Sequence, residues 1–430
     1  MIGLAAVVAL LVAAQDPTGN ATVDSASAAR IAWRRASEAL QGGETAAARR
    51  EVSRADGAWP TPEAYAWGSV ILAARANDTV AVIRALGTYA DLGLGRDIVM
   101  ESALTPFLSV PAMAMVVARH EANRSTVARG TVRATMPDST FWPEGMDYDA
   151  STGSYYVASI RHRMIAELRP GKPSRELLPR GMNGIGAILG VRVDAARGVL
   201  WATTAGIPQM EGYQPADSAI AALLRIRMHD GFVERRWDLP PSATGHTLGD
   251  LAVGARGEIY VTDSKEPVLY RLPPGGDSLV AMRHPLFRSL QGIAPAPDGR
   301  TLYVADWSHG ILRVDLTTGA VDRVKDAPGS VSLGCDGIAW DRGAIVAVQN
   351  GVTPARVMRF VLAASGTEFV RAELLDRNAP VADEPTIGAI VGREFVYVAN
   401  SQWNKYDDWG KRLTKVPLTA PVLLAVPLSR

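Results

Sequence analysis

The sequence predicts a mainly β protein, a six-bladed β-propeller preceded by a small α-helical domain, on three observations. Apolar residues recur at helical spacing up to about residue 123. Beyond that point they alternate with period two between Gly and Asp turns. Within this second part, six segments of about 40–50 residues align with one another. We therefore expect an α-helical domain at 15–126 and the propeller at 127–430.

The first residues form a separate element. Ile2 to Ala14 is an unbroken apolar run, and the first charged residue is Asp16. A membrane span needs about 18–20 apolar residues, so this run has the length of a signal-peptide core. We predict a signal peptide at 1–14 and export of the protein, to the periplasm or the medium; an uncleaved hydrophobic anchor is the alternative. No other segment is long and apolar enough to predict a transmembrane span in the mature chain.

Four helices are expected in the front domain. The first presents one apolar face and ends at Gly42-Gly43. The others are expected at 45–55, 63–76 and 79–90. These Ala-rich pairs, separated by Gly, resemble tetratricopeptide-type helical hairpins, which implies a protein partner for the helical region. A helical bundle without a peptide-binding role is the alternative interpretation.

Each propeller unit is an alternating strand, a tight Asp/Gly turn and a strongly apolar second strand. The six aligned segments begin at Met146, Val191, Leu251, Ile293, Ile338 and Ile387. Six units of four strands are the signature of a propeller, in which each blade buries both faces against its neighbours. The strands 131–136 and 422–428 flank the repeats, and we expect them to complete one shared blade.

Composition excludes several classes of function. Lys and Arg number 45 against 44 Asp and Glu, and this balance argues against a nucleic-acid partner. The one cysteine excludes an intramolecular disulfide framework and any multi-cysteine metal site. The G-x-S-x-G, P-loop and H-E-x-x-H patterns are absent from the sequence.

The inner strands of a propeller begin at one mouth of its central channel. The residues two positions before the aligned strands should point into that mouth: Glu144, Leu189, Gly249, Gln291, Asp336 and Pro385. Scaffold positions should repeat, because each blade solves the same packing problem, and these positions do not. Two carboxylates and an amide carbonyl form an all-oxygen set suited to a hard divalent cation. The alternative is that these groups satisfy backbone donors or water.

Three segments resemble motifs of the gluconolactonase family, which includes the senescence marker protein and the luciferin-regenerating enzyme. They are FWPEGMDYD (141–149), LQGIAPAPDGRTLYVAD (290–306) and CDGIAWD (335–341). The resemblance covers the propeller and implies a metal-dependent lactone hydrolase with a Glu, an Asn and an Asp on the ion. Glu144 takes the Glu place and Asp336 the Asp place, whereas Gln291 stands where the family has Asn.

Other candidates surround this set. A further Asn that lines the family's pocket is Gly249 here, and its neighbour Asp250 is our candidate for substrate binding. Trp403, in the Trp-rich tail 401–412, either walls a substrate pocket or pins the tail to the propeller edge. His246 enters blade three, and it or Asp336 would handle the proton; a surface loop histidine is the alternative.

A second set of polar residues ends the second strand of each blade. It consists of Ser159, Thr204, Asp263, Asp306, Gln349 and Asn400. Such side chains usually cap turns through hydrogen bonds to the backbone, and we expect that role here.

Together these patterns predict a metal-dependent hydrolase of lactone or ester bonds. Glu144, Gln291 and Asp336 would hold the ion, with Ca²⁺ as the first candidate and Mg²⁺, Mn²⁺ or Zn²⁺ as the others. The alternative is a non-enzymatic module, in which the helices and the propeller mouth bind a protein, glycan or signalling ligand.

Overall fold

The computed structural model describes residues 25–58 and 63–428, so the predicted signal peptide at 1–14 lies outside the described residues. The chain divides into two compact units. One contains the described residues up to 125 together with 329–331, and the other contains the described residues at 126–328 and from 332 on. Within the described ranges, no helix has the length and apolar character needed to cross a membrane.

The first unit is α-helical, and the four helices expected from the sequence are confirmed. Its elements are α2 (Ser25–Gln41), α3 (Thr45–Ala58), α4 (Glu63–Arg75), α5 (Thr79–Asp91), the short 3₁₀ helix η1 (Ser102–Phe107) and α6 (Pro111–Arg124). Gly43 follows α2 with a φ of 77°, a conformation that glycine adopts without strain. Asp78 caps α5 by accepting the Ala81 N–H at 3.0 Å.

The second unit is the six-bladed β-propeller, as predicted. Blade one contains β2 (Pro143–Asp149), β3 (Ser154–Ser159), β4 (Met164–Leu168) and β5 (Arg175–Leu178). Blade two contains β6 (Ala187–Asp194), β7 (Val199–Ala205), β8 (Ala221–Arg227) and β9 (Val233–Asp238). Blade three contains β10 (Leu248–Val253), β11 (Ile259–Asp263), β12 (Val268–Leu272) and β13 (Val280–Met282).

The remaining blades repeat this antiparallel order. Blade four contains β14 (Leu290–Pro295), β15 (Thr301–Asp306), β16 (Gly310–Asp315) and β17 (Val321–Arg323). Blade five contains β18 (Cys335–Asp341), β19 (Ala344–Gln349), β20 (Arg356–Leu362) and β21 (Phe369–Arg377). Blade six contains β22 (Gly388–Val391), β23 (Glu394–Val398), β24 (Val422–Pro427) and β1 (Thr131–Thr135).

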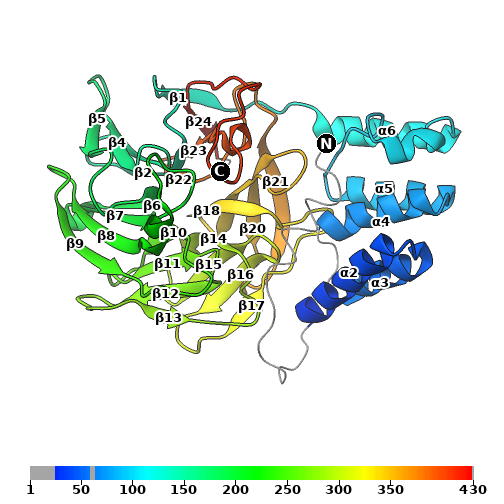
Figure 1. Ribbon diagram of the computed structural model, residues 1–430, viewed down its shortest axis with the longest axis horizontal. Helices are drawn as coiled ribbons and strands as arrows, with labels where there is room; N and C mark the ends of the chain where they lie inside the picture. The colour runs from blue at the N-terminus through cyan, green and yellow to red at the C-terminus, as the bar shows by residue number, and fades with distance from the viewer. Residues whose placement is uncertain (1–24, 59–62, 429–430) are drawn as a thin grey trace. The chain divides into compact units, whose positions relative to one another are not determined.

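Blade six closes the ring with strands from both ends of the propeller sequence. β1 pairs antiparallel with β24, with Thr131 opposite Ala425 and Thr135 opposite Val422. In Figure 1 the cyan β1 lies beside the red β24. The expectation that residues 131–136 and 422–428 complete one shared blade is therefore confirmed.

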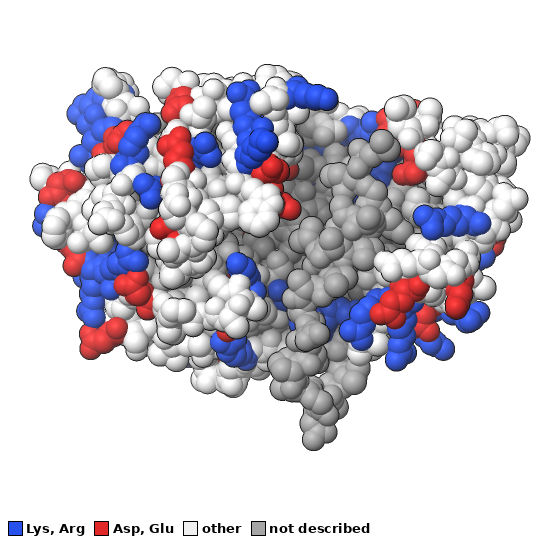
Figure 2. All heavy atoms as spheres, in the orientation of Figure 1, with Lys and Arg blue, Asp and Glu red and all other residues white. Residues whose placement is uncertain are grey.

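The hydrophobic core of the propeller lies between blades. Each of six clusters combines residues of two neighbouring sheets, as where Ile165 and Leu178 of blade one meet Leu200 of blade two. Every blade therefore buries both of its faces, and removing one blade would expose two clusters. On the face drawn in Figure 2, acidic and basic side chains are interspersed over the propeller.

Candidate functional site

The candidate site begins with a β-bulge at the start of an inner strand. The register of each of the first five inner strands breaks between the following pairs: Pro143 and Met146, Ile188 and Val191, Leu248 and Leu251, Leu290 and Ile293, and Cys335 and Ile338. Glu144, Gln291 and Asp336 all lie within these breaks. A bulge turns a side chain out of the strand's normal alternation, so the bulges distinguish these residues from the scaffold around them.

In four of these five strands the residue after the bulge side chain is a glycine that packs directly on the next blade, whereas blade three has Asp250 there. A Cβ at Gly145 would lie 2.2 Å from the Leu189 carbonyl oxygen, and one at Gly337 would lie 2.6 Å from the Ile387 Cα. Only glycine allows this backbone approach. Since Gly337 also faces the Thr386 carbonyl oxygen, Thr386 and not Pro385 holds the equivalent place in blade six.

Threonine hydroxyls link three pairs of neighbouring blades at these positions. Thr203 donates to the Gly249 carbonyl at 2.7 Å, and Thr262 donates to the Gln291 carbonyl at 2.7 Å. Thr386 of blade six donates to the Glu144 carbonyl at 3.0 Å. These bonds join blade two to three, three to four, and six to one, so they fix the backbone from which Glu144 and Gln291 project.

Glu144 is held by the tail of the chain. The indole N–H of Trp403 donates to Glu144 Oε2 at 2.8 Å, across 259 residues of sequence. The pKa of Glu144 is raised well above its ordinary value by burial and, next, by the negative charge of Asp336. The Trp403 hydrogen bond opposes this rise without cancelling it. The two predicted carboxylates therefore interact electrostatically.

Asp336 has a raised pKa for similar reasons. Burial raises the pKa of Asp336 to about 7, and the charge of Asp250 adds to the rise. Asn350 opposes it by donating from Nδ2 to Asp336 Oδ2 at 2.7 Å, while the same Nδ2 also reaches the Pro385 carbonyl at 2.8 Å. The other amide atom, Asn350 Oδ1, is buried without a hydrogen-bond partner among the described residues.

Gln291 contributes an open amide oxygen. Its Nε2 donates to Ser289 Oγ at 3.2 Å, and no described residue donates to its Oε1. Gln291 therefore has an amide oxygen available to a ligand. The blades that carry Gln291, Glu144 and Asp336 set where this oxygen lies relative to the two carboxylates.

Asp250 lies inside the channel wall rather than open to a ligand. Its Oδ2 accepts from Arg192 Nη2 at 2.7 Å, and its Oδ1 accepts the Leu251 N–H at 2.8 Å. Arg192 also donates to the Met146 carbonyl at 3.3 Å. This buried pair joins blades one, two and three, and it uses the hydrogen-bonding capacity of Asp250 within the protein.

His246 is buried, unlike a surface loop histidine. Nδ1 lies 2.6 Å from Asp263 Oδ2, and Nε2 lies 3.0 Å from the Pro240 carbonyl. Both ring nitrogens are therefore engaged inside blade three and its entry loop. Asp263 also accepts the Thr247 N–H at 3.0 Å, so this cluster shapes the loop that leads to β10.

The tail 401–412 packs on the propeller around Trp403. Trp142 lies between two tail rings, edge-on to Trp403 at 5.1 Å and stacked on Tyr406 at 4.0 Å. Lys405 forms an ion pair with Asp383 before blade six. The tail is thus pinned to the propeller, and Trp403 at the same time touches Glu144.

The second polar set caps turns, as predicted. Asp306 Oδ2 accepts the Arg288 N–H at 2.8 Å, and Asn400 Oδ1 accepts the Val422 N–H at 2.7 Å. Thr204 Oγ1 accepts the Gly186 N–H at 2.9 Å. Asp306 and Thr204 thereby fix the loops that enter the inner strands β14 and β6, and Asn400 fixes the start of β24.

The candidate donor atoms at this mouth are all oxygens. Glu144 and Asp336 oppose each other's ionisation, and the unpartnered Asn350 oxygen lies on the amide that binds Asp336. All of these donors are oxygen atoms, which Ca²⁺ and Mg²⁺ prefer. Among the described residues, no group of three or more His, Cys, Asp and Glu side chains is arranged to hold a metal ion. Any ion here would therefore depend on amide oxygens and water beside two carboxylates.

Sequence reasoning missed Asn350 and Arg192. Asn350 follows Gln349, the residue aligned with the turn-capping set, and its approach to Asp336 depends on where β19 ends. Arg192 lies one residue inside an aligned inner strand, where an exposed side chain is expected. The available signal was a charged residue at a position that is alanine in blades three, four and five, a feature that blade one shares through Asp147.

Comparisons with known proteins give only distant structural likenesses. No family model matches the sequence, and no curated protein matches it. Among solved structures, a regucalcin from Agrobacterium tumefaciens, described as a calcium-binding protein, is 16% identical, with a TM-score of 0.47 over 70% of this chain and 98% of that chain. The PQQ-bound aldose sugar dehydrogenase of Streptomyces coelicolor is 14% identical, with a TM-score of 0.47 over 70% and 99%. A luciferin-regenerating enzyme is 13% identical, with a TM-score of 0.47 over 70% and 95%.

Proposed function

We propose that the propeller hydrolyses lactone or ester bonds at the mouth formed by Glu144, Gln291 and Asp336, with a divalent cation bound there. The carrying observation is the electrostatic coupling of Glu144 and Asp336, which come from blades one and five. Two buried like charges are costly unless a proton or a cation compensates them. A divalent cation matches their combined charge, and Ca²⁺ is the first candidate for an all-oxygen set.

The residues of the chain supply ligands and orientation. Glu144 and Asp336 would hold the ion, and the unpartnered amide oxygens of Gln291 and Asn350 would be the remaining protein ligands. When bound, such an ion would act as a Lewis acid toward a lactone or ester carbonyl. Trp403 orients Glu144 through its N–H, and Asn350 orients Asp336 through Nδ2.

Proton transfer is best assigned to Asp336. Its carboxyl has a pKa of about 7, which suits a group that takes and returns a proton near neutral pH. His246 was the other candidate, but both of its ring nitrogens are bonded to Asp263 and Pro240. We therefore give His246 the role of holding the loop before β10, and Asp250 the role of holding Arg192.

The test is a hydrolysis assay on sugar lactones and acyl lactones, run with chelator and then with Ca²⁺, Mg²⁺, Mn²⁺ or Zn²⁺. We expect cation-dependent turnover that falls by at least about 100-fold in Glu144→Gln and Asp336→Asn. Asp322→Asn, an exposed carboxylate on β17, is the matched control and should keep full activity. Turnover without any cation, or unchanged in both site variants, contradicts the proposal.

A binding module is the second candidate. It is favoured by Trp403, whose N–H already occupies one oxygen of Glu144, and by Gly249, which offers no side chain to a substrate. Calorimetry with Ca²⁺ separates the two functions. Cation binding without turnover on any lactone or ester tested would favour the binding module.

A further inference from the structure

An open cavity of about 740 Å³ lies at the end of the propeller opposite Glu144. Residues that line it are Pro297, Trp340, Asp341, Arg342, Ile390 and Arg393. β18 begins at the mouth with Cys335 and Asp336 and ends at this cavity with Asp341. Five residues of strand rise by about 17 Å, so the cavity is separate from the candidate hydrolase site.

The cavity exists because two adjacent turns are short. In blade five Asp341 pairs with Ala344, and in blade six Val391 pairs with Glu394, so each turn has two central residues. The corresponding turn of blade one has four, because Asp149 pairs with Ser154. The short turns leave a hollow beside the longer neighbouring turns. Each short turn places an arginine at the rim.

Arg342 is fixed in a strained conformation. It has a φ of 45°, a left-handed conformation that a hairpin turn usually gives to Asn, Asp or Gly. Its Nε donates to Asp341 Oδ1 at 2.8 Å, and Arg359 Nε donates to Asp341 Oδ2 at 2.9 Å. Two guanidinium groups therefore neutralise one carboxylate. A charged side chain held in a strained turn is an observation that suggests a functional role.

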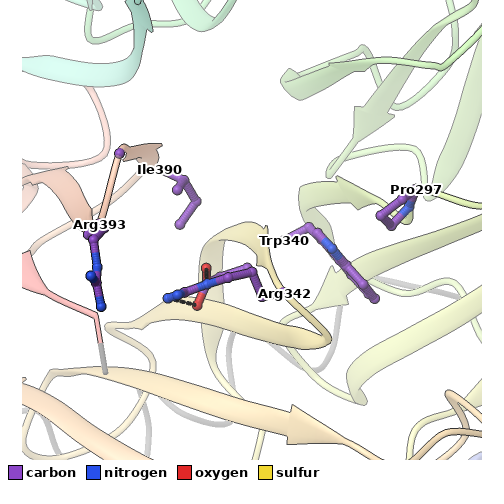
Figure 3. Close-up of a pocket in the computed structure, with 7 residues that line it drawn as sticks. Pro297, Trp340, Arg342, Ile390 and Arg393 are labelled. Carbon is purple, nitrogen blue, oxygen red and sulfur yellow. Dashed lines mark hydrogen bonds and ion pairs between the residues drawn. The ribbon is translucent and has the colours of Figure 1, made fainter. Parts of the chain in front are cut away.

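Arg393 supplies a second cation to the cavity. It is exposed, and it forms no hydrogen bond or ion pair through its side chain with the described residues. It follows Gly392, whose φ of 61° allows the tight turn. Figure 3 shows Arg342 between Trp340 and Arg393. The lining thus has a net positive charge, since Asp341 is already paired twice.

The wall next to these cations is flat and apolar. Trp340 stacks on Tyr303 with ring centroids 5.8 Å apart and planes inclined by 24°. The Tyr303 hydroxyl donates to the Gly366 carbonyl at 3.0 Å, which fixes the stack. Figure 3 shows Trp340 and Pro297 on one side of the cavity and Ile390 and Arg393 on the other. A planar hydrocarbon body would fit between these walls.

We propose that this cavity binds a small organic anion, with its carboxylate between Arg342 and Arg393 and its flat apolar body against Trp340. A guanidinium group matches a carboxylate in a planar, two-point contact, and a tryptophan face favours planar ligands. The cavity volume is in the range of small-molecule sites, about 300–1,000 Å³. The site does not depend on the proposed hydrolase activity.

Calorimetry with 2-naphthoate tests the site, with the neutral 2-naphthamide as the matched ligand. We expect saturable binding of naphthoate and binding of the amide that is at least about fivefold weaker. In Arg393→Ala the Kd for naphthoate should rise about five- to tenfold, because the variant loses an exposed charge-assisted contact. Arg300→Ala is the control, an exposed arginine in the blade-four turn that does not line the cavity. It should bind naphthoate as the wild type does.

Charge reversal sharpens the result. Arg393→Glu should lose naphthoate binding and gain affinity for 2-naphthylmethylammonium, while Asp336→Asn should leave naphthoate binding unchanged. The proposal is overturned if naphthoate shows no saturable binding, if the amide binds equally well, or if Arg393→Ala and Arg300→Ala behave alike. Loss of naphthoate binding in Asp336→Asn would overturn it too, because the anion would then occupy the other mouth.

Discussion

Replacing Asp336 by Asn should stabilise the propeller at alkaline pH. The folded chain raises the pKa of Asp336 from an ordinary 3.8 to about 7, mainly through burial. The folded state therefore binds this proton more tightly than the unfolded state does. Stability from this group is complete below about pH 3.8 and is lost as the pH rises to about 7. The ionised carboxylate destabilises the folded state, and Asn, which carries no charge, avoids this destabilisation.

The size of the effect follows from the shift. Each pKa unit corresponds to about 1.4 kcal/mol, so the ionised carboxylate costs about 4 kcal/mol at about pH 8 and about 1.5 kcal/mol at about pH 5. We expect Asp336→Asn to gain stability, and the gain at about pH 8 to exceed that at about pH 5 by about 3 kcal/mol. Urea denaturation of both proteins at both pH values measures it, since the helical unit is identical in the pair.

Asp341→Asn is the matched control on the same strand. Hydrogen bonds from Arg342 and Arg359 lower the pKa of Asp341, although burial acts in the opposite direction. Removing this carboxylate takes from buried Arg359 its hydrogen-bonded partner, with Glu373 left at 3.5 Å, and should destabilise the protein by about 2 kcal/mol. Millimolar Ca²⁺ should raise the free energy of unfolding of the wild type at about pH 8, by about 2.7 kcal/mol when its concentration is 100 times the Kd for Ca²⁺. The same Ca²⁺ should leave the stability of Asp336→Asn unchanged. An Asp336→Asn gain that is absent, or equal at both pH values, refutes the reasoning.

Three other outcomes are expected. Gly337→Ala should lower the free energy of unfolding by about 2–4 kcal/mol in urea denaturation, because its Cβ would meet the backbone of blade six at 2.6 Å. Gly249→Ala is the control and should be tolerated, since its Cβ would lie 3.5 Å from its nearest neighbour. Equal effects of the two substitutions would contradict this reasoning. Trp403→Phe removes the N–H that lowers the pKa of Glu144, and calorimetry should show Ca²⁺ binding weakened by about tenfold. Burial raises the pKa of the Cys335 thiol, so a thiol reagent should label it only after unfolding; rapid labelling of the native protein would show that the blade is open.

The propeller could be predicted from the sequence because its evidence is repeated. Period-two alternation and Asp/Gly turns occur in every blade, so an ambiguous unit is supported by the clear ones. The flanking strands 131–136 and 422–428 had only one place to pair. The one error in alignment is in blade six, where β22 begins only at Gly388 and Thr386, not Pro385, holds the place equivalent to Asp336. An aligned repeat cannot predict which residue holds a given position in a blade that departs from the repeat.

The candidate site was less predictable because its contacts are not repeated. Glu144, Gln291 and Asp336 could be singled out as polar residues at aligned positions, but their partners could not. Trp403 reaches Glu144 across 259 residues, through a tail that no blade repeats. His246 titrates in a useful range, yet only the structure shows both nitrogens bonded. Side-chain pairing depends on loop conformation, which alternation does not encode.

The pairing of β1 with β24 has a consequence for biosynthesis. β1 leaves the ribosome first of all the propeller strands, and its partner β24 is made last. At about 5–20 residues per second, β1 waits on the order of 15–60 s before the ring can close. β23 is made only shortly before β24, so its edge is unpaired for on the order of 1–5 s, whereas β1 waits through the synthesis of every blade. Open strand edges promote aggregation, and Arg133 places a charge on β1, the strand that waits longest.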